Sequence, residues 1–237
     1  MGKHTDFILS PITEILQDVI SSSRGVGIGI ETYPLSGYIM QSAFLKMTGA
    51  QEQKMKCICW ELATNDYQYR YDRYTLTRLG ECSDYREKKI VYSDLINAIR
   101  KYKTDFNPEI ALNKRDIRRE TFSAVRDLLI NSNVSTWAEN YFSNFVSGGA
   151  FFAKEDFATE KELLLNVLQN KYKLLHNHRN RCAHNTLSYQ ENLPTLNALF
   201  SMNYKDDNYF VRFGLLILID NIFIELYKKY LDVLREY

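Results

Sequence analysis

The sequence predicts an all-α protein with a single domain, and three observations support this prediction. Only 4 prolines and 10 glycines occur among 237 residues, so few positions interrupt a helix. Apolar residues recur at spacings of three and four along most of the chain, which is the helical period. No stretch has the composition of a flexible linker or the regularity of a repeat. We therefore expect one helical domain spanning residues 1–237.

The N-terminal elements follow from local signals. Ser10-Pro11 combines a capping serine with a proline at the first helical position, and predicts a helix that runs to about Gly25. The segment from Gly25 to Leu35 is rich in glycine and β-branched residues and indicates a loop or a short extended piece. A second helix is expected from about Ser36 to Ala63, with Gly49 as a candidate break.

The middle of the chain is less uniform. Residues 67–74 alternate aromatic and polar side chains, which indicates either a strand or an aromatic-faced connection. Helices are expected at about 93–103, 115–131 and 135–147, followed by a loop around Gly148-Gly149. Trp60 and Trp137 are expected in the core.

The C-terminal part predicts two longer helices. Thr159 with Glu162 fits a capping box, from which a helix is expected to run to about residue 184. A short segment near 194–201 precedes a final helix from about Asp207 to the end. Its longest apolar run, Leu215–Ile219, is far shorter than the roughly 20 residues of a membrane span, so we expect no membrane association.

Composition narrows the possible functions. The net charge of +1 provides no global attraction to nucleic acid, so any RNA contact has to come from a local basic patch. Among the 4 cysteines only Cys57 and Cys59 are close in sequence, and a single C-x-C is a poor zinc signature. The first residues contain no apolar secretory segment. We expect reduced thiols, a cytoplasmic protein, and neither a metal nor another cofactor.

The most informative motif is Arg179-Asn180-Arg181-Cys182-Ala183-His184, which reads R-N-x-x-x-H near the end of a predicted helix. A histidine exchanges protons near neutral pH, an arginine meets phosphate charge, and an amide orients either group. On a helix, Arg179 points close to the apolar stripe, whereas His176, Asn180 and His184 form an adjoining face. An arginine near a packing face needs a carboxylate partner, or a cavity or interface that takes anions.

The motif resembles the R-x(4–6)-H signature of the HEPN superfamily (higher eukaryotes and prokaryotes nucleotide-binding), in which asparagine often follows the arginine. The resemblance covers about residues 120–237, which would form the HEPN-like helical core. Residues 1–115 would be an N-terminal extension with additional helices, and the sequence assigns it no role. Family membership implies a bundle of four to five helices that dimerises so that two motifs face each other. Many members are metal-independent endoribonucleases, often toxins or effectors of phage defence.

The resemblance also implies roles for three residues. His184 would act as general base on the ribose 2′-OH or as general acid on the leaving 5′-oxygen, and a pKa near 6.5 suits both tasks. Arg179 would stabilise charge in the phosphorane-like transition state, and Asn180 would orient His184 or the phosphate. One histidine does not readily serve as both acid and base in a turnover, so activity is expected to require a homodimer. The products would carry 2′,3′-cyclic phosphate and 5′-hydroxyl ends.

Neighbouring residues are candidates for RNA contacts. Lys171, Lys173 and Arg181 form a basic cluster with Arg179, and His176 and His178 are candidate RNA-contacting imidazoles. The alternative is an ordinary solvated helix face. A metal held by His176 and His178 is disfavoured, since these side chains point about 200° apart on a helix. The tyrosines of residues 67–74, with Arg70 and Arg73 between them, could stack on single-stranded bases, although packing is the simpler explanation.

Two functional hypotheses result, and a purely structural helical protein remains a third alternative. The first is a homodimeric ribonuclease acting on RNA, with tRNA among the candidate substrates and an antitoxin or other regulatory protein as a further partner. The second is a catalytically inactive HEPN-like dimeric module that binds a protein or a nucleotide. The discriminating observation is whether Arg179 and His184 share an open groove or are buried against carboxylates.

Overall fold

A computed structural model describes residues 2–27, 29–147, 156–184 and 208–236. For Ile30, Tyr33, Pro34, Trp137 and His184 it describes the backbone alone. Within these ranges the regular structure is helical, and the β-type pairing is a single isolated bridge between Phe157 and Leu164. The all-α class is confirmed.

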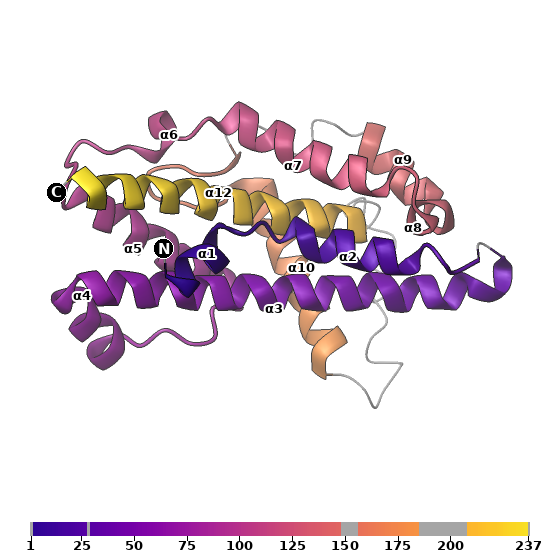
Figure 1. Cartoon of the computed structure of the whole chain (residues 1–237), viewed down its shortest axis with the longest axis horizontal. Helices are drawn as coiled ribbons and strands as arrows, with labels where there is room; N and C mark the ends of the chain where they lie inside the picture. Colours follow the sequence, from indigo (N-terminus) through magenta and orange to yellow (C-terminus); the bar gives the residue numbers. More distant parts are fainter. Residues whose placement is uncertain (1, 28, 148–155, 185–207, 237) are drawn as a thin grey trace.

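Two long helices, α3 (Tyr33–Asn65) and α12 (Tyr209–Glu236), form the frame of the molecule and lie side by side (Figure 1). Every residue from Phe210 to Asp220 is buried, so this part of α12 is the centre of the core. A helix that is apolar all round needs neighbours on every side. These are supplied by α3, α1 (Lys3–Leu9), α5 (Tyr85–Arg100) and α7 (Lys114–Leu129), while α2 (Thr13–Ser23) packs against α3 and α7.

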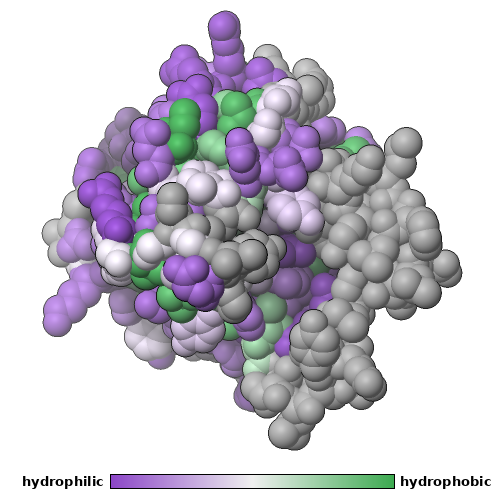
Figure 2. All heavy atoms as spheres, turned by 90° about the vertical axis from the view of Figure 1, so that its right-hand side faces the viewer, coloured by the Kyte–Doolittle hydropathy of each residue, from purple (hydrophilic) through white to green (hydrophobic). Residues whose placement is uncertain are grey.

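Shorter elements complete the bundle. They are a 3-10 turn at Ile30–Thr32, α4 (Tyr67–Tyr71), a π-helical turn at Asp72–Leu76, α6 (Pro108–Ala111), α8 (Asn133–Trp137) and α9 (Glu139–Ser147). Helix α10 (Asn166–His184) crosses α3, and its last turns extend beyond that helix (Figure 1). The end of the bundle that carries α8 and α9 presents mainly hydrophilic side chains among scattered apolar ones (Figure 2). A single buried cluster runs from Ile8 to Val233, so residues on both sides of the predicted division near 115–120 share one core.

Several sequence-based expectations are confirmed. Helices α7 and α12 occupy the segments predicted near 115–131 and from about 207 onward. Helix α3 covers the predicted segment 36–63 and passes Gly49 without a break. A glycine inside a helix costs about 1 kcal/mol. Burial of Met47 and Met55 on either side of Gly49 offsets this cost.

The predicted start of the first helix is wrong. Ser10 does not cap α2; it ends an additional helix, α1, and its hydroxyl donates to the Phe7 carbonyl at 2.9 Å. Helix α2 begins at Thr13 and has no side-chain cap of its own. The cap comes from another part of the chain, because the Ile12 amide donates to Asp220 Oδ2 at 2.9 Å. The tertiary contact with Asp220, and not the local Ser10-Pro11 signal, therefore determines where α2 begins.

The strand predicted as one alternative for residues 67–74 is also wrong. The Asp66 side chain accepts the Tyr69 amide at 3.0 Å and starts α4, which continues into the π-helical turn. Helix α5 begins at Tyr85 rather than near 93, because Asp84 accepts the Glu87 amide at 2.7 Å. Both starts use an aspartate cap that the apolar spacing does not mark.

The capping box at Thr159 is a turn instead. The Thr159 hydroxyl accepts the Glu162 amide at 3.0 Å, while the Thr159 amide donates to the Glu162 carbonyl at 2.9 Å. This reciprocal pair closes a hairpin-like turn next to the Phe157–Leu164 bridge, and α10 begins only at Asn166.

The helix predicted at 135–147 divides at Ala138 into α8 and α9. Trp60 is 57% exposed, so its assignment to the core is wrong. The Trp137 side chain, the loop around Gly148-Gly149 and the segment near 194–201 lie outside the described residues.

A buried ion pair joins the two long helices. Lys54 of α3 lies 2.7 Å from Asp220 of α12, and both side chains are almost fully buried. Lys54 also donates to the Ser10 carbonyl, and Asp220 accepts the Ile12 amide. Burial raises the pKa of Asp220 and lowers that of Lys54, and each charge opposes the shift of the other. The pair ties α3, α12 and the α1–α2 junction together.

Among the described residues, no helix has the length and apolar character needed to cross a membrane.

Replacing Asp220 with alanine is expected to lower the free energy of unfolding by about 3–5 kcal/mol, because Lys54 is left as an unpaired buried charge. The double variant Lys54→Met/Asp220→Asn is expected to recover part of this loss, since no charge remains and asparagine still accepts the Ile12 amide. Urea denaturation of the single and double variants measures both effects. A double variant less stable than Asp220→Ala would show that the charge pair is not the source of the effect.

Candidate functional site

The R-N-x-x-x-H motif occupies the last turns of α10, as predicted. The apolar stripe that precedes it is confirmed, since Leu168, Tyr172 and Leu175 are 0–2% exposed. Two members of the predicted adjoining face lie together, because Asn180 Nδ2 is 3.0 Å from His176 Nε2, four residues earlier. The backbone of His184 completes the helix, and its side chain lies outside the described residues.

Arg179 has a carboxylate partner on α3. Its Nη2 atom lies 3.1 Å from Oε1 and 3.2 Å from Oε2 of Glu52, and the two side chains are 22% and 12% exposed. Of the two environments considered for this arginine, the structure places it against a carboxylate. Because the pair is close to the surface, solvent still screens it, and it is less costly to break than the buried Lys54–Asp220 pair.

A chain of hydrogen bonds continues from Arg179. Its Nη1 donates to Asn180 Oδ1 at 3.3 Å, which turns the Asn180 amide nitrogen toward His176. His176 Nδ1 lies 3.2 Å from the Ser83 carbonyl, which can only accept. All these contacts are satisfied together when the His176 proton is on Nδ1 and Nε2 accepts from Asn180. The network therefore fixes the rotamers of Arg179 and Asn180 one turn before His184.

A small polar cavity lies beneath this network. It has a volume of about 10 Å³, room for roughly one water molecule, and it is lined by Glu52, Arg179, His176, Lys88 and Gln51, among others. Lys88 is buried and donates to the Cys82 carbonyl at 2.8 Å; burial lowers its pKa to about 8, and Glu52 opposes this shift. Gln51 donates to the Leu216 carbonyl at 2.9 Å, and its Oε1 has no partner among the described residues. A water molecule bound in this cavity would donate a hydrogen bond to Gln51 Oε1.

His178 points away from this network toward α12 and α3. Its Nε2 lies 3.1 Å from the Tyr209 hydroxyl, and its ring packs against Phe44 with centroids 5.4 Å apart. Burial, with the charges of Arg212 and Arg181, lowers the pKa of His178 to about 3. His178 is thus an uncharged packing residue, and we leave it out of the proposed RNA contacts.

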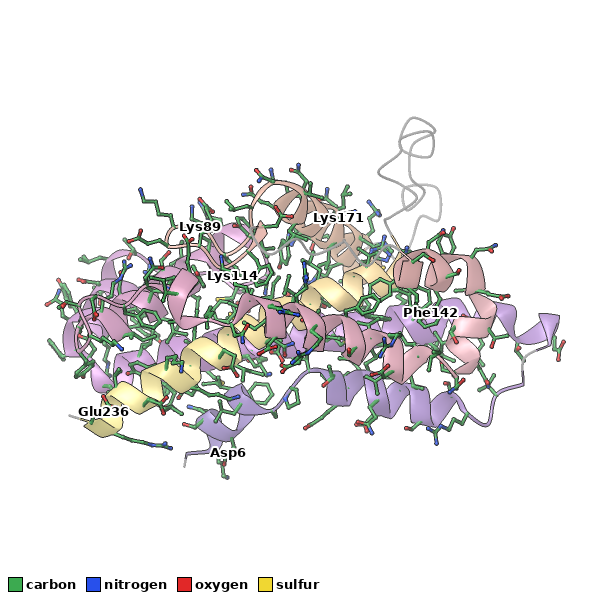
Figure 3. All side chains as sticks on the ribbon, turned by 90° about the horizontal axis from the view of Figure 1, so that it is seen from above. Asp6, Lys89, Lys114, Phe142, Lys171 and Glu236 are labelled. Carbon is green, nitrogen blue, oxygen red and sulfur yellow. The ribbon has the colours of Figure 1, made fainter. Side chains whose placement is uncertain are left out.

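The remaining candidates lie nearer to solvent. Lys173 is exposed, and Lys171 and Arg181 are partly exposed on α10 (Lys171 is labelled in Figure 3). Arg181 Nη2 lies 3.5 Å from His178 Nδ1. No group of three or more potential metal ligands occurs in the described part of the chain.

No family model, no curated protein and no solved structure matches this chain.

Glu52 and Ser83 are site residues that the sequence did not indicate. Glu52 lies within a helical pattern far from the motif, and Ser83 contributes only a backbone carbonyl. The one signal available was indirect, namely that an arginine near the packing face of α10 requires a carboxylate. Nothing in the sequence identifies which of the chain's 29 acidic residues supplies it.

We expect His178 to stay uncharged well below neutral pH. Its folded-state pKa of about 3 lies below the unfolded value of 6.5, so between these values the folded protein binds fewer protons than the unfolded chain. Its contribution to stability is complete above pH 6.5 and is lost as the pH falls, by up to about 1.4 kcal/mol per pH unit.

Urea denaturation from pH 7 to pH 4 measures this loss, with His178→Gln as the control. Glutamine can still hydrogen-bond to the Tyr209 hydroxyl but does not titrate, so this variant is expected to lose less stability on acidification. Identical pH slopes for both proteins would contradict the assignment.

Proposed function

We propose that the chain is a metal-independent endoribonuclease of HEPN type that acts as a homodimer. The observation that carries the proposal is the hydrogen-bonded chain from Glu52 through Arg179 and Asn180 to His176. It fixes a guanidinium and an amide on the turn of α10 that leads to His184. A ribonuclease without a metal relies on a proton-transferring side chain and on a positive group that stabilises the phosphoryl charge, which are the roles proposed for His184 and Arg179.

The proposed reaction is a transesterification within the RNA strand. His184 takes the proton of the ribose 2′-OH, and the 2′-oxygen attacks the adjacent phosphorus. The bond from phosphorus to the 5′-oxygen breaks, and that oxygen takes a proton from His184 of the second subunit. Arg179 offsets the charge that develops on the phosphoryl oxygens. The strand then ends in a 2′,3′-cyclic phosphate and a 5′-hydroxyl.

Substrate binding is assigned to the partly exposed cations of α10. Lys173, Lys171 and Arg181 would hold neighbouring phosphates, and His176 would contribute through its link to Asn180. The last turns of α10 extend past α3 (Figure 1), and the proposal places the second copy against them. By the resemblance, the biological role would be that of a toxin or phage-defence effector, with a regulatory protein partner.

A second candidate function is a catalytically inactive HEPN-like module. The Glu52–Arg179 ion pair favours it, because a substrate phosphate has to compete with the carboxylate for the guanidinium. Such a module would dimerise and bind a protein or a nucleotide without cleaving RNA.

Cleavage of tRNA and total RNA by the purified protein in EDTA tests the first candidate. The variants His184→Ala and Arg179→Ala are each expected to lose at least about a hundredfold in rate, which is the usual contribution of a general acid–base group. Asn177→Ala, an exposed position on the same helix, serves as the matched control and is expected to cleave normally. Cleavage that persists in both site variants would disprove the assigned site.

Mixing experiments test the dimer. If each turnover needs His184 from both subunits, mixtures of wild-type and His184→Ala chains that exchange subunits will show activity that falls with about the square of the wild-type fraction. A linear fall would show that each subunit cleaves by itself.

A further inference from the structure

A second pocket lies at the opposite end of α3 from its N-terminus, where α4, α5 and α12 also end or begin (Figure 1). Its volume is about 160 Å³, close to that of an engineered protein cavity of about 150 Å³ that holds a benzene molecule. The lining comes from Leu62, Asn65, Asp66, Tyr69, Ala98, Lys101, Tyr102 and Tyr230. None of these residues belongs to the R-N-x-x-x-H site.

The walls and the rim of the pocket differ in character. Leu62 and Tyr230 are buried and form apolar walls together with the other two tyrosines. Asn65 donates from Nδ2 to the Glu61 carbonyl at 3.0 Å and to the Tyr230 hydroxyl at 3.2 Å, so its Oδ1 remains as an acceptor. Asp66 forms an ion pair with Lys101. An aromatic pocket bordered by acceptors and one ammonium group suits a flat ring that carries hydrogen-bond donors.

Three exposed tyrosines lie on α4 and the π-helical turn, close in sequence to the pocket residues Asp66 and Tyr69. Tyr67 is 80% exposed, Tyr71 is 46% exposed and Tyr74 is 44% exposed. Tyr67 and Tyr71 are four residues apart on α4 and therefore share a face. Of the tyrosines between residues 67 and 74, only Tyr69 is largely enclosed, with its hydroxyl donating to Asp94 at 3.0 Å. Packing therefore explains Tyr69 and does not explain the other three.

The charge on this face is also favourable for a polyanion. Arg70 and Arg78 are exposed beside the tyrosines. Arg73 is partly buried, held by Asp94 at 2.6 Å, and lies over the Tyr69 ring. Exposed aromatic rings alternating with cations are the features by which proteins stack the bases and hold the phosphates of single strands. A protein partner with an apolar face would not require the cations or the acceptors in the pocket.

We propose that this end of the molecule binds single-stranded RNA through its bases, with one base in the pocket and further bases of the same strand stacked on Tyr67 and Tyr71, which lie on the opposite face of α4 from the pocket residue Tyr69. The remaining acceptor Asn65 Oδ1 favours a base with an exocyclic amino group, whereas the two Asp66 oxygens are engaged by the Tyr69 amide and by Lys101. Cytosine should therefore bind better than uracil, which presents an oxygen at the same position. This inference stands apart from the cleavage chemistry proposed for α10.

Binding of short 2′-O-methyl oligonucleotides to the full chain tests the proposal. These probes have no free 2′-OH and resist cleavage, so a failed cleavage assay does not affect the outcome. We expect fluorescence anisotropy to show tighter binding of oligocytidine than of oligouridine. Cytidine monophosphate, the free-nucleotide arm, is expected to bind at least tenfold more weakly than the oligomer, because it lacks the stacked neighbours.

The pocket is tested by filling it. Ala98→Leu adds volume at a lining position without removing a contact, and is expected to weaken oligocytidine binding at least about fivefold. Asn97→Leu introduces the same side chain one residue earlier on α5, at an exposed position outside the lining, and should bind normally.

The stacking surface is tested by truncating its rings. Tyr67→Ala and Tyr71→Ala are each expected to weaken binding about fivefold or more. Tyr38→Ala is the matched control, since Tyr38 is a 70% exposed tyrosine on α3 that is separate from this surface. Circular dichroism confirms that each variant is folded.

Four results would overturn the proposal. Absence of oligocytidine binding would contradict the proposed site. So would binding that is unchanged in Ala98→Leu and in both tyrosine variants. Equal affinity for cytidine monophosphate and for the oligomer would show that the ligand is a free nucleotide and not an RNA strand. Equal affinity for oligocytidine and oligouridine would exclude recognition of the base edge.

Discussion

The arrangement depends on how one stretch of α3 is attached to α12. Gln51 donates to the Leu216 carbonyl, and Lys54, one turn later, pairs with Asp220, one turn after Leu216. Because these polar groups are buried, any sliding of one helix along the other leaves them unsatisfied, at a cost of several kcal/mol. The same aspartate caps the Ile12 amide, so the N-terminal helices are held to the same point. These buried polar contacts therefore fix the register of α3 against α12.

This attachment also positions the candidate site. Glu52 lies between the two buried contacts of α3 and points instead to Arg179 on α10. The guanidinium, Asn180 and His176 then follow in a single chain of hydrogen bonds that ends at the Ser83 carbonyl before α5. On the other side of α10, His178 is enclosed by aromatic rings and kept uncharged. Helix α10 thus separates a polar network from a packed face.

The two proposed nucleic-acid contacts use different physical properties and lie on different elements. On α10 the groups are those that act on phosphate, namely a guanidinium, an amide and a histidine. Around α4 they are tyrosine rings and a pocket that recognise bases. Binding at α4 and chemistry at α10 can therefore be lost independently by substitution. This separation lets experiments assign each contribution to one of the two proposed sites.

The sequence by itself determined the all-α class, the long C-terminal helices and the place of R-N-x-x-x-H at the end of α10, because apolar spacing is a local property. It also required a partner for Arg179. The predicted starts of α2 and α10 were wrong. The Ser10-Pro11 signal does not start α2, because Asp220 accepts the Ile12 amide from a distant part of the chain, and Thr159 closes a turn instead of capping α10. Only the tertiary structure decided that Glu52 pairs with Arg179, that His178 packs inside, and that three tyrosines near α4 stay exposed. These outcomes depend on contacts between residues far apart in the chain, which no local pattern encodes.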